Sequence, residues 1–173
     1  MALDFACPDW EERLRRGVSP FPDLPLDHAA ADAAVGVFDF LRLPDVAGFP
    51  LLKDAAGQWY RDIVRAAFGS TDRQTGERWL SEIFCLVPKK NSKTTYSAAL
   101  GITALLQNET PNATMIIVGP TKELADICFS QAKGIIEADP VDPETGESYL
   151  ANRFHVNEGD QEITDRLNKT TLT

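Results

Sequence analysis

The sequence predicts an α/β fold in which a parallel sheet is connected by helical crossovers. Two short apolar runs, at residues 83–87 and 114–118, carry the branched and aromatic side chains of buried strands. A segment with apolar residues at helical spacing follows each run, over residues 94–106 and 121–138. Strands that alternate with amphipathic helices in this way form parallel sheets covered by helices.

The loop between the first run and its helix indicates a nucleotide site. Residues 87–94 read V-P-K-K-N-S-K-T, whereas the phosphate-binding loop is G-x-x-x-x-G-K-S/T between a strand and a helix. Lys93 and Thr94 match that pattern, and Val87 and Ser92 stand at its glycine positions. The helix that follows would direct its free N–H groups and the positive end of its dipole at a phosphate. The predicted fold is therefore a P-loop NTPase.

Each loop side chain has an expected role with ATP and Mg²⁺ as cofactors. Lys93 is expected to neutralise the β and γ phosphates, and Thr94 to hold Mg²⁺ through its hydroxyl. Lys89 and Lys90 add positive charge at the mouth of the loop. The alternative is a turn between a strand and a helix with a solvated lysine cluster.

Composition excludes several classes of protein. The chain has 173 residues, 43% of them hydrophobic and 25% charged, which is typical of a globular protein. No apolar stretch approaches the roughly 20 residues of a membrane span, and the first residues lack the basic flank of a signal peptide, so a cytoplasmic location without membrane contact is expected. A net charge of −9 argues against a free-standing nucleic-acid binder. Neither His28 nor His155 has a neighbour at metal-ligand spacing.

The chain is expected to divide near residue 50. Residues 1–50 are expected to form a helical appendage and connector, with one helix ended by Gly17 and a second running from Asp27 to Leu43. Residues 51–173 are expected to form the N-terminal part of the ATPase domain, starting with a helix over residues 54–68 and including short strands near 153–156 and 169–173. No internal repeat is expected.

The order of these features resembles a known family. Leu51-Leu52 and Gln58-Trp59, the loop strand and loop at residues 82–94, and I-V-G-P-T at residues 117–121 follow one another as in the ATPase domain of tailed-bacteriophage terminase large subunits. Many members of that family have an Asn-Gly-Lys-Ser core in the loop, from which Asn91-Ser92-Lys93-Thr94 differs chiefly at Ser92. The resemblance covers roughly residues 50–173, and the spacing of the motifs carries it.

The resemblance implies further site residues. Gln58 would be the glutamine that reads the adenine base, and Lys89 or Lys90 the extra cation that senses the γ-phosphate. The segment Gly119-Pro120-Thr121 would couple the state of the nucleotide to DNA contact. The alternatives are an exposed helix glutamine at Gln58 and a plain helix N-cap at Thr121.

The resemblance also implies a DNA-packaging motor, encoded by a phage or prophage and working in the bacterial cytoplasm. Its partners would be double-stranded DNA, the terminase small subunit and the portal, and the complete protein would form a homo-oligomeric ring. The chain lacks the family's strand ending in Asp-Glu and its nuclease domain, so the fold is expected to be incomplete at the C-terminus. Without these catalytic parts, we expect ATP binding with hardly any hydrolysis.

Two other functions fit the sequence. One is a fragment of a different P-loop ATPase that remodels DNA. The other is a non-enzymatic adaptor with a relic loop, which would dock a partner through the apolar residues between Val35 and Leu41.

Overall fold

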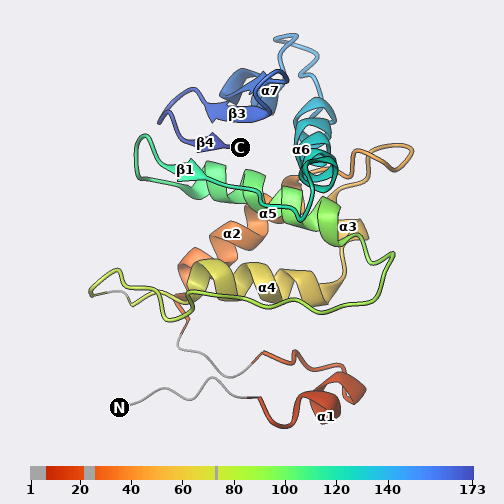
Figure 1. The fold of residues 1–173 in the computed structure, drawn as a ribbon, viewed down its shortest axis with the longest axis vertical. Coiled ribbons are helices and arrows are strands. Elements are labelled where there is room, and N and C mark those ends of the chain that lie inside the picture. The colour runs from red at the N-terminus through yellow and green to blue at the C-terminus, as the bar shows by residue number, and fades with distance from the viewer. Residues whose placement is uncertain (1–6, 22–25, 73) are drawn as a thin grey trace. The chain divides into compact units, whose positions relative to one another are not determined.

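The computed structural model describes residues 7–21, 26–72 and 74–173. It has a mixed α/β structure with several helices and one four-stranded mixed sheet (Figure 1). The described residues divide into two compact units, one formed by residues up to Gly36 with Ala56–Leu86 and the other by Val37–Ala55 with Val87–Thr173. The predicted boundary near residue 50 stays a prediction.

The first unit contains α1 (Trp10–Arg15), most of α2 (His28–Phe40) and α4 (Gln58–Gly69). Gly17 follows α1 with φ of 68°, a left-handed conformation in which glycine has no steric penalty, so the predicted helix and its end are confirmed. Asp27 caps α2, since its Oδ1 accepts hydrogen bonds from the backbone N–H groups of Ala29 and Ala30. The predicted N-cap is therefore confirmed, although α2 ends at Phe40 rather than Leu43.

Helices α2 and α4 approach closely at Gly69. A Cβ atom at this position would lie 2.7 Å from the Cβ of Ala31, so only glycine fits without a shift. The Asp27 backbone N–H donates to the Gly69 carbonyl oxygen at 2.6 Å. The single helix predicted for residues 54–68 is wrong, because α3 (Leu52–Ala55) and α4 are separate helices. Gly57 has an extended conformation between them, which interrupts the helical hydrogen-bond ladder.

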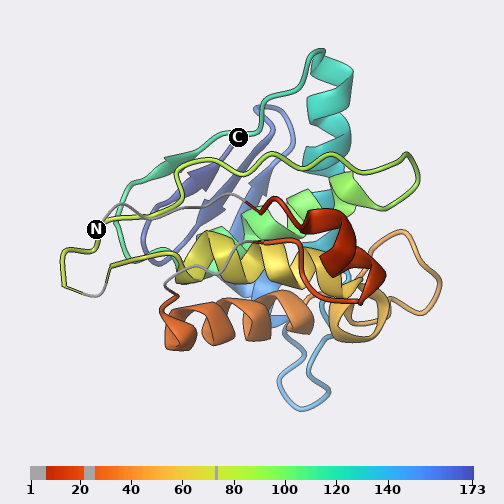
Figure 2. The ribbon, with the colours of Figure 1, turned by 90° about the horizontal axis from the view of Figure 1, so that it is seen from below.

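The second unit contains α5 (Lys93–Gln107), α6 (Lys122–Glu137), α7 (Tyr149–Arg153) and the sheet, in which α5 runs beneath the strands and α6 stands beside them (Figure 1, Figure 2). The strand order is β1-β4-β3-β2. The strands are β1 (Thr114–Met115), β2 (Phe154–Asn157), β3 (Glu162–Asp165) and β4 (Thr171–Leu172).

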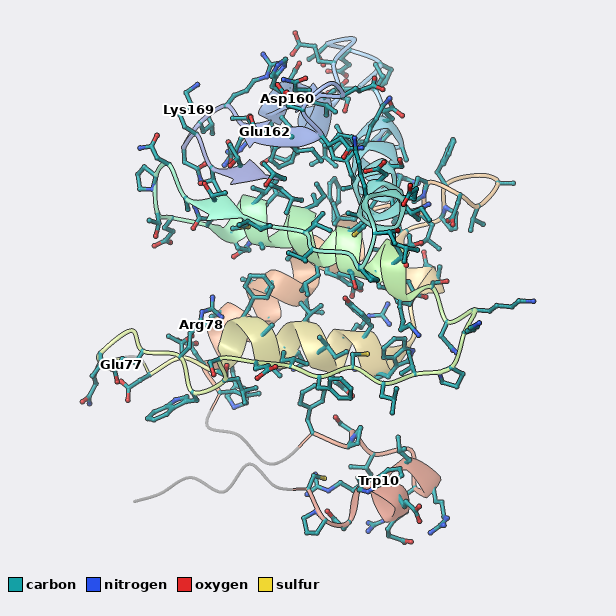
Figure 3. All side chains as sticks on the ribbon, viewed as in Figure 1. Trp10, Glu77, Arg78, Asp160, Glu162 and Lys169 are labelled. Carbon is teal, nitrogen blue, oxygen red and sulfur yellow. The ribbon has the colours of Figure 1, made fainter. Side chains whose placement is uncertain are left out.

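The sheet is mixed, so the prediction of a parallel sheet is wrong in part. Strands β1 and β4 are parallel, whereas β3 is antiparallel to both β2 and β4. The β2–β3 pair is antiparallel because a tight hairpin joins the two strands, and Asn157 Oδ1 holds its turn by accepting from the N–H groups of Gly159 and Asp160. A hairpin can only join antiparallel strands. Figure 3 shows Asp160 and Glu162 on this hairpin.

The two apolar runs predicted as buried strands are largely exposed. No described residue from 82 to 87 belongs to a strand, and Phe84 and Leu86 are 86% and 83% exposed. The second run pairs with β4 at Thr114 and Met115, and the Ile117 N–H donates to the Thr173 carbonyl oxygen at 2.6 Å. The side chains of Ile116 and Val118 are nevertheless exposed. The predicted buried strand at 83–87 is therefore wrong for this structure, since side-chain type favours an extended backbone but cannot supply a neighbouring strand.

The core of the second unit lies between the sheet, α5 and α6. Leu172 of β4 contacts α5 so closely that a Cβ at Gly101 would meet its side chain at 3.1 Å. The largest fully buried apolar side chains of this unit are Phe38, Leu41, Leu52, Ile102, Leu105, Ile135, Leu150, Phe154 and Ile163. Burial of this apolar surface is the main term that stabilises the unit.

One turn occurs twice with the same hydrogen bonds. Residues 72–77 and 142–147 share the pattern Asp-x-x-Thr-Gly-Glu, which the sequence analysis did not recognise as a repeat. In each turn the aspartate N–H donates to the glutamate carbonyl oxygen, at 2.8 Å for Asp72 and 2.9 Å for Asp142. The aspartate Oδ1 accepts a 2.7 Å bond from the N–H of Gln74 or Glu144. Figure 3 shows Glu77 and Arg78 on the first copy.

Candidate functional site

The predicted phosphate loop closes around its own lysine. The ammonium of Lys93 donates to the carbonyl oxygen of Val87 at 2.7 Å and to that of Pro88 at 3.4 Å. Asn91 braces the same turn, because its side-chain amide donates to the Pro88 carbonyl at 3.1 Å. An ammonium has three donors, so Lys93 keeps one for an external acceptor while the two carbonyls fix its position.

The loop has left-handed backbone at two positions. Lys90 and Ser92 have φ of 67° and 51°. Ser92 occupies the second glycine position of the motif and has to adopt the conformation that glycine takes most readily. The substitution at this position thus preserves the turn at a cost in backbone strain.

Helix α5 starts at Lys93 and directs backbone donors at the loop. Ser92 is the N-cap residue, but its side chain makes no capping hydrogen bond. The first bond of the helix runs from the Tyr96 N–H to the Ser92 carbonyl at 2.9 Å, so the preceding N–H groups of Lys93 and Thr94 have no partner within the helix. Free N–H groups at the start of a helix favour the binding of an anion.

A cavity of about 460 Å³ lies beside the loop. All six predicted loop residues line it: Lys89, Lys90, Asn91, Ser92, Lys93 and Thr94. Its volume falls within the roughly 300–1,000 Å³ usual for ligand pockets. The three lysines make its wall strongly basic in a chain whose net charge is −9.

Four residues that were not predicted as part of the site also line this cavity: Asp45, Thr95, Ile127 and Gln131. Ile127 and Leu124 were predicted to lie in the apolar stripe of α6, but both are half-exposed, and the buried stripe consists of Cys128, Phe129, Ala132, Ile135 and Ile136. The i, i+4 spacing of Ile127 and Gln131 could have indicated a common face. Among the described residues, no donor reaches the buried Oε1 of Gln131.

Helix α6 is held against the start of α5. The thiol of Cys128 lies 3.8 Å from the Thr94 carbonyl oxygen, and burial raises the pKa of this thiol. The N-terminus of α6 depends on Gly119, because a Cβ there would lie 2.8 Å from the Ala125 nitrogen. Thr121 is at the N-cap position, but its side chain makes no capping bond to the helix backbone.

Gln58 lies in the first unit and the loop in the second. It is the exposed first residue of α4, and its side-chain amide donates to the Asp62 carboxylate at 3.0 Å. An amide that already serves a neighbour on its own helix retains one donor and its carbonyl acceptor. Its role in reading adenine remains a prediction.

Some of the apolar residues between Val35 and Leu41, predicted as a docking surface for an adaptor, are buried. Phe38 and Leu41 are buried, and the ring of Phe38 makes an edge contact with Tyr96 at a centroid distance of 6.4 Å. These side chains serve the chain's own core, so the apolar residues between Val35 and Leu41 do not form one continuous docking face.

Comparisons with protein-family models, curated proteins and solved structures found no match to this chain. In the part of the chain that the structure describes, no helix has the length and hydrophobicity needed to cross a membrane. The same residues contain no group of three or more His, Cys, Asp or Glu side chains placed to hold a metal ion.

Proposed function

We propose that this chain binds Mg-ATP through the loop at residues 88–94. The observation that carries the proposal is the pair of bonds from the Lys93 ammonium to the Val87 and Pro88 carbonyls beside a basic cavity. A lysine fixed in this way can meet a phosphate oxygen without first losing side-chain freedom. The adjacent helix start supplies backbone donors for the same phosphate group.

The donor set of the cavity fits a magnesium nucleotide. Lys89, Lys90 and Lys93 match the negative charge of the phosphates, and the hydroxyl of Thr94 is an oxygen ligand suited to Mg²⁺. Magnesium, when bound, neutralises phosphate charge and orients the phosphate chain. Asn91 and Ser92 shape the turn, through the bond from the Asn91 amide to the Pro88 carbonyl and the left-handed backbone at Ser92.

We further propose that the chain is the ATP-binding portion of a viral DNA-packaging motor, a terminase large subunit. The order and spacing of its motifs support this wider role. In the complete protein ATP hydrolysis would drive double-stranded DNA into a procapsid. For this chain alone we expect ATP binding with hardly any hydrolysis.

The decisive experiment is calorimetric titration of Mg-ATP into the wild type and Lys93→Ala. We expect binding by the wild type and at least a roughly tenfold loss of affinity in the variant, equivalent to about 1.4 kcal/mol. Lys122→Ala is the matched control, because Lys122 is an exposed lysine of α6 that does not line the cavity. Equal affinities of wild type and Lys93→Ala would contradict the proposal.

A further inference from the structure

A second cavity, of about 470 Å³, lies at the loop that joins α6 to α7. Three large apolar side chains line it and remain exposed, namely Phe40 at 50%, Val141 at 61% and Tyr149 at 57%. Two of the three are aromatic, so the cavity offers ring surface to a ligand. Figure 2 shows this loop in light blue.

The charged side chains lining this cavity are all carboxylates: Asp139, Asp142 and Glu147. Asp139 is buried and accepts hydrogen bonds from the Ser148 hydroxyl at 2.7 Å and the Leu150 N–H at 2.9 Å. Its role is therefore structural, as it holds the start of α7. Asp142 and Glu147 are exposed, and neither has an ion-pair partner among the described residues.

Asp142 and Glu147 retain acceptor capacity. One oxygen of Asp142 accepts from the N–H groups of Glu144 and Thr145, and one oxygen of Glu147 accepts from the Asn152 amide at 2.7 Å. A carboxylate has about four acceptor positions, so each can take further donors. The cavity thus combines aromatic surface with open anionic acceptors.

The related turn at Asp72 differs from this one in the residue that follows its glutamate. That copy has the same internal hydrogen bonds, yet Arg78 follows its glutamate where Ser148 follows Glu147. The Arg78 guanidinium donates to the carbonyl oxygen of Ala67, whereas the Ser148 hydroxyl donates to Asp139 in the wall of the second cavity. None of the residues of the first turn lines the second cavity.

We propose that this cavity binds an arginine side chain presented by a partner protein. A guanidinium can stack on Tyr149 or Phe40 while it donates to the carboxylates of Asp142 and Glu147. Arginine fits better than lysine because its group is planar, is more weakly hydrated and carries five donors. The binding does not depend on nucleotide at the Lys93 loop.

The test uses fluorescence anisotropy of a labelled peptide, acetyl-Gly-Arg-Gly-Gly-Arg-Gly-amide, titrated with the full chain. The same peptide with citrulline in place of arginine keeps the shape and removes the charge, and a lysine version keeps the charge and removes the planar group. We expect the arginine peptide to bind, the lysine peptide to bind more weakly and the citrulline peptide not to bind. Failure of the arginine peptide to bind the wild type overturns the proposal.

Two double variants distinguish binding of the peptide at this cavity from non-specific electrostatic binding to an acidic protein. Asp142→Asn combined with Glu147→Gln removes two charges and keeps the acceptor oxygens that hold the turn. Asp72→Asn combined with Glu77→Gln removes two charges from the related turn outside the cavity. We expect about a tenfold loss of peptide affinity, roughly 1.4 kcal/mol, only in the first pair. Equal losses in both pairs overturn the proposal.

Tyr149→Ala and Tyr149→Phe test the aromatic wall. The phenylalanine variant keeps the ring face and should bind the arginine peptide like the wild type, whereas alanine should weaken binding several-fold. Thermal melts by circular dichroism establish that each variant is folded. Equal binding by the alanine and phenylalanine variants would exclude stacking on Tyr149.

Discussion

The Lys93 ammonium is 2.7 Å from the carbonyl oxygen of Val87, so the lysine bridges the two ends of its own loop. This bond closes the turn at Pro88–Ser92 and orients the lysine before any phosphate arrives. The same turn forces Ser92 into left-handed backbone, with φ of 51°. The turn at residues 88–92 therefore produces both the closed loop and the backbone strain at Ser92. Substitutions can test both effects.

Ser92→Gly should stabilise the protein. Left-handed backbone costs a residue with a Cβ roughly 1–2 kcal/mol, and glycine avoids this cost while it loses more chain entropy on folding, so a net gain of at most about 1 kcal/mol is expected. For a chain of this size that gain raises the thermal midpoint by roughly 2–4 °C. Differential scanning calorimetry measures the shift.

Ser130→Gly is the control for this effect. Ser130 is an exposed residue in the interior of α6, where glycine should lower stability by about 0.5 kcal/mol because its helix propensity is poorer. Opposite signs at the two serines would show that the backbone conformation decides the result. A lower melting temperature for Ser92→Gly would count against strain at the loop.

Removal of the buried ion pair between Arg153 and Asp165 should destabilise the chain strongly. The Asp165 side chain is 0% exposed, and its Oδ2 lies 2.7 Å from Nη2 of Arg153, a residue whose side chain is 17% exposed. Asp165→Ala leaves the Arg153 charge without this partner, a change that typically costs about 3–5 kcal/mol. Glu11→Ala, which removes one of the two exposed glutamates that pair with Arg15, should cost less than about 1 kcal/mol.

Urea denaturation of both variants gives the comparison directly. The midpoint should fall clearly for Asp165→Ala and hardly move for Glu11→Ala, with similar slopes for both. Similar midpoints for the two variants would mean that the Arg153–Asp165 pair contributes no more than a surface pair.

Local patterns predicted four of the helices, α1, α2, α5 and α6. Gly17, Asp27 and the apolar spacing after Lys93 each indicated a helix end or face that the structure contains. Such features depend on residues only three or four positions apart, so they can be recognised in the sequence alone. The loop cavity is also a local feature in part, because residues 89–94 are consecutive in the sequence and all line it.

Features that depend on distant partners could not be predicted in this way. An apolar run at residues 83–87 indicates extended backbone, but pairing requires a neighbouring strand, and Phe84 remains exposed. Strand β3 was missed because its E-I-T-D sequence has a single apolar residue, although Ile163 is fully buried. Likewise, Asp45 reaches the loop cavity from a segment more than forty positions earlier in the chain.

Polar substitution of Phe84 and Leu86 should leave stability nearly unchanged. Both side chains are more than four-fifths exposed, so Phe84→Ser with Leu86→Ser should change the free energy of unfolding by less than about 0.5 kcal/mol per site. Phe154→Ala is the comparison, because this buried ring should cost about 3–5 kcal/mol. Chemical denaturation distinguishes the cases, and a large loss at Phe84 would indicate that the run is buried in solution.

Iodoacetamide should distinguish Cys85 from Cys128. Cys85 is exposed, whereas Cys128 is buried and packed beside the Thr94 carbonyl, and this burial raises the pKa of its thiol. The thiolate is the reactive form, so at pH 8 Cys85 should be alkylated rapidly and Cys128 slowly. Mass spectrometry of peptides from timed reactions measures both rates, and Cys85→Ser confirms which peptide carries the fast label.

The raised pKa of the Cys128 thiol also determines how this residue's contribution to stability depends on pH. A raised pKa means that the folded chain holds the proton more tightly than the unfolded chain does. The contribution to stability is therefore complete below the ordinary cysteine pKa of about 8.5 and is lost as the pH rises through that value towards the raised pKa. Alkylation of Cys128 should accelerate over this range, and it should equal that of Cys85 only when urea unfolds the protein. Equal rates in the native protein at pH 8 would show that α6 does not protect this thiol.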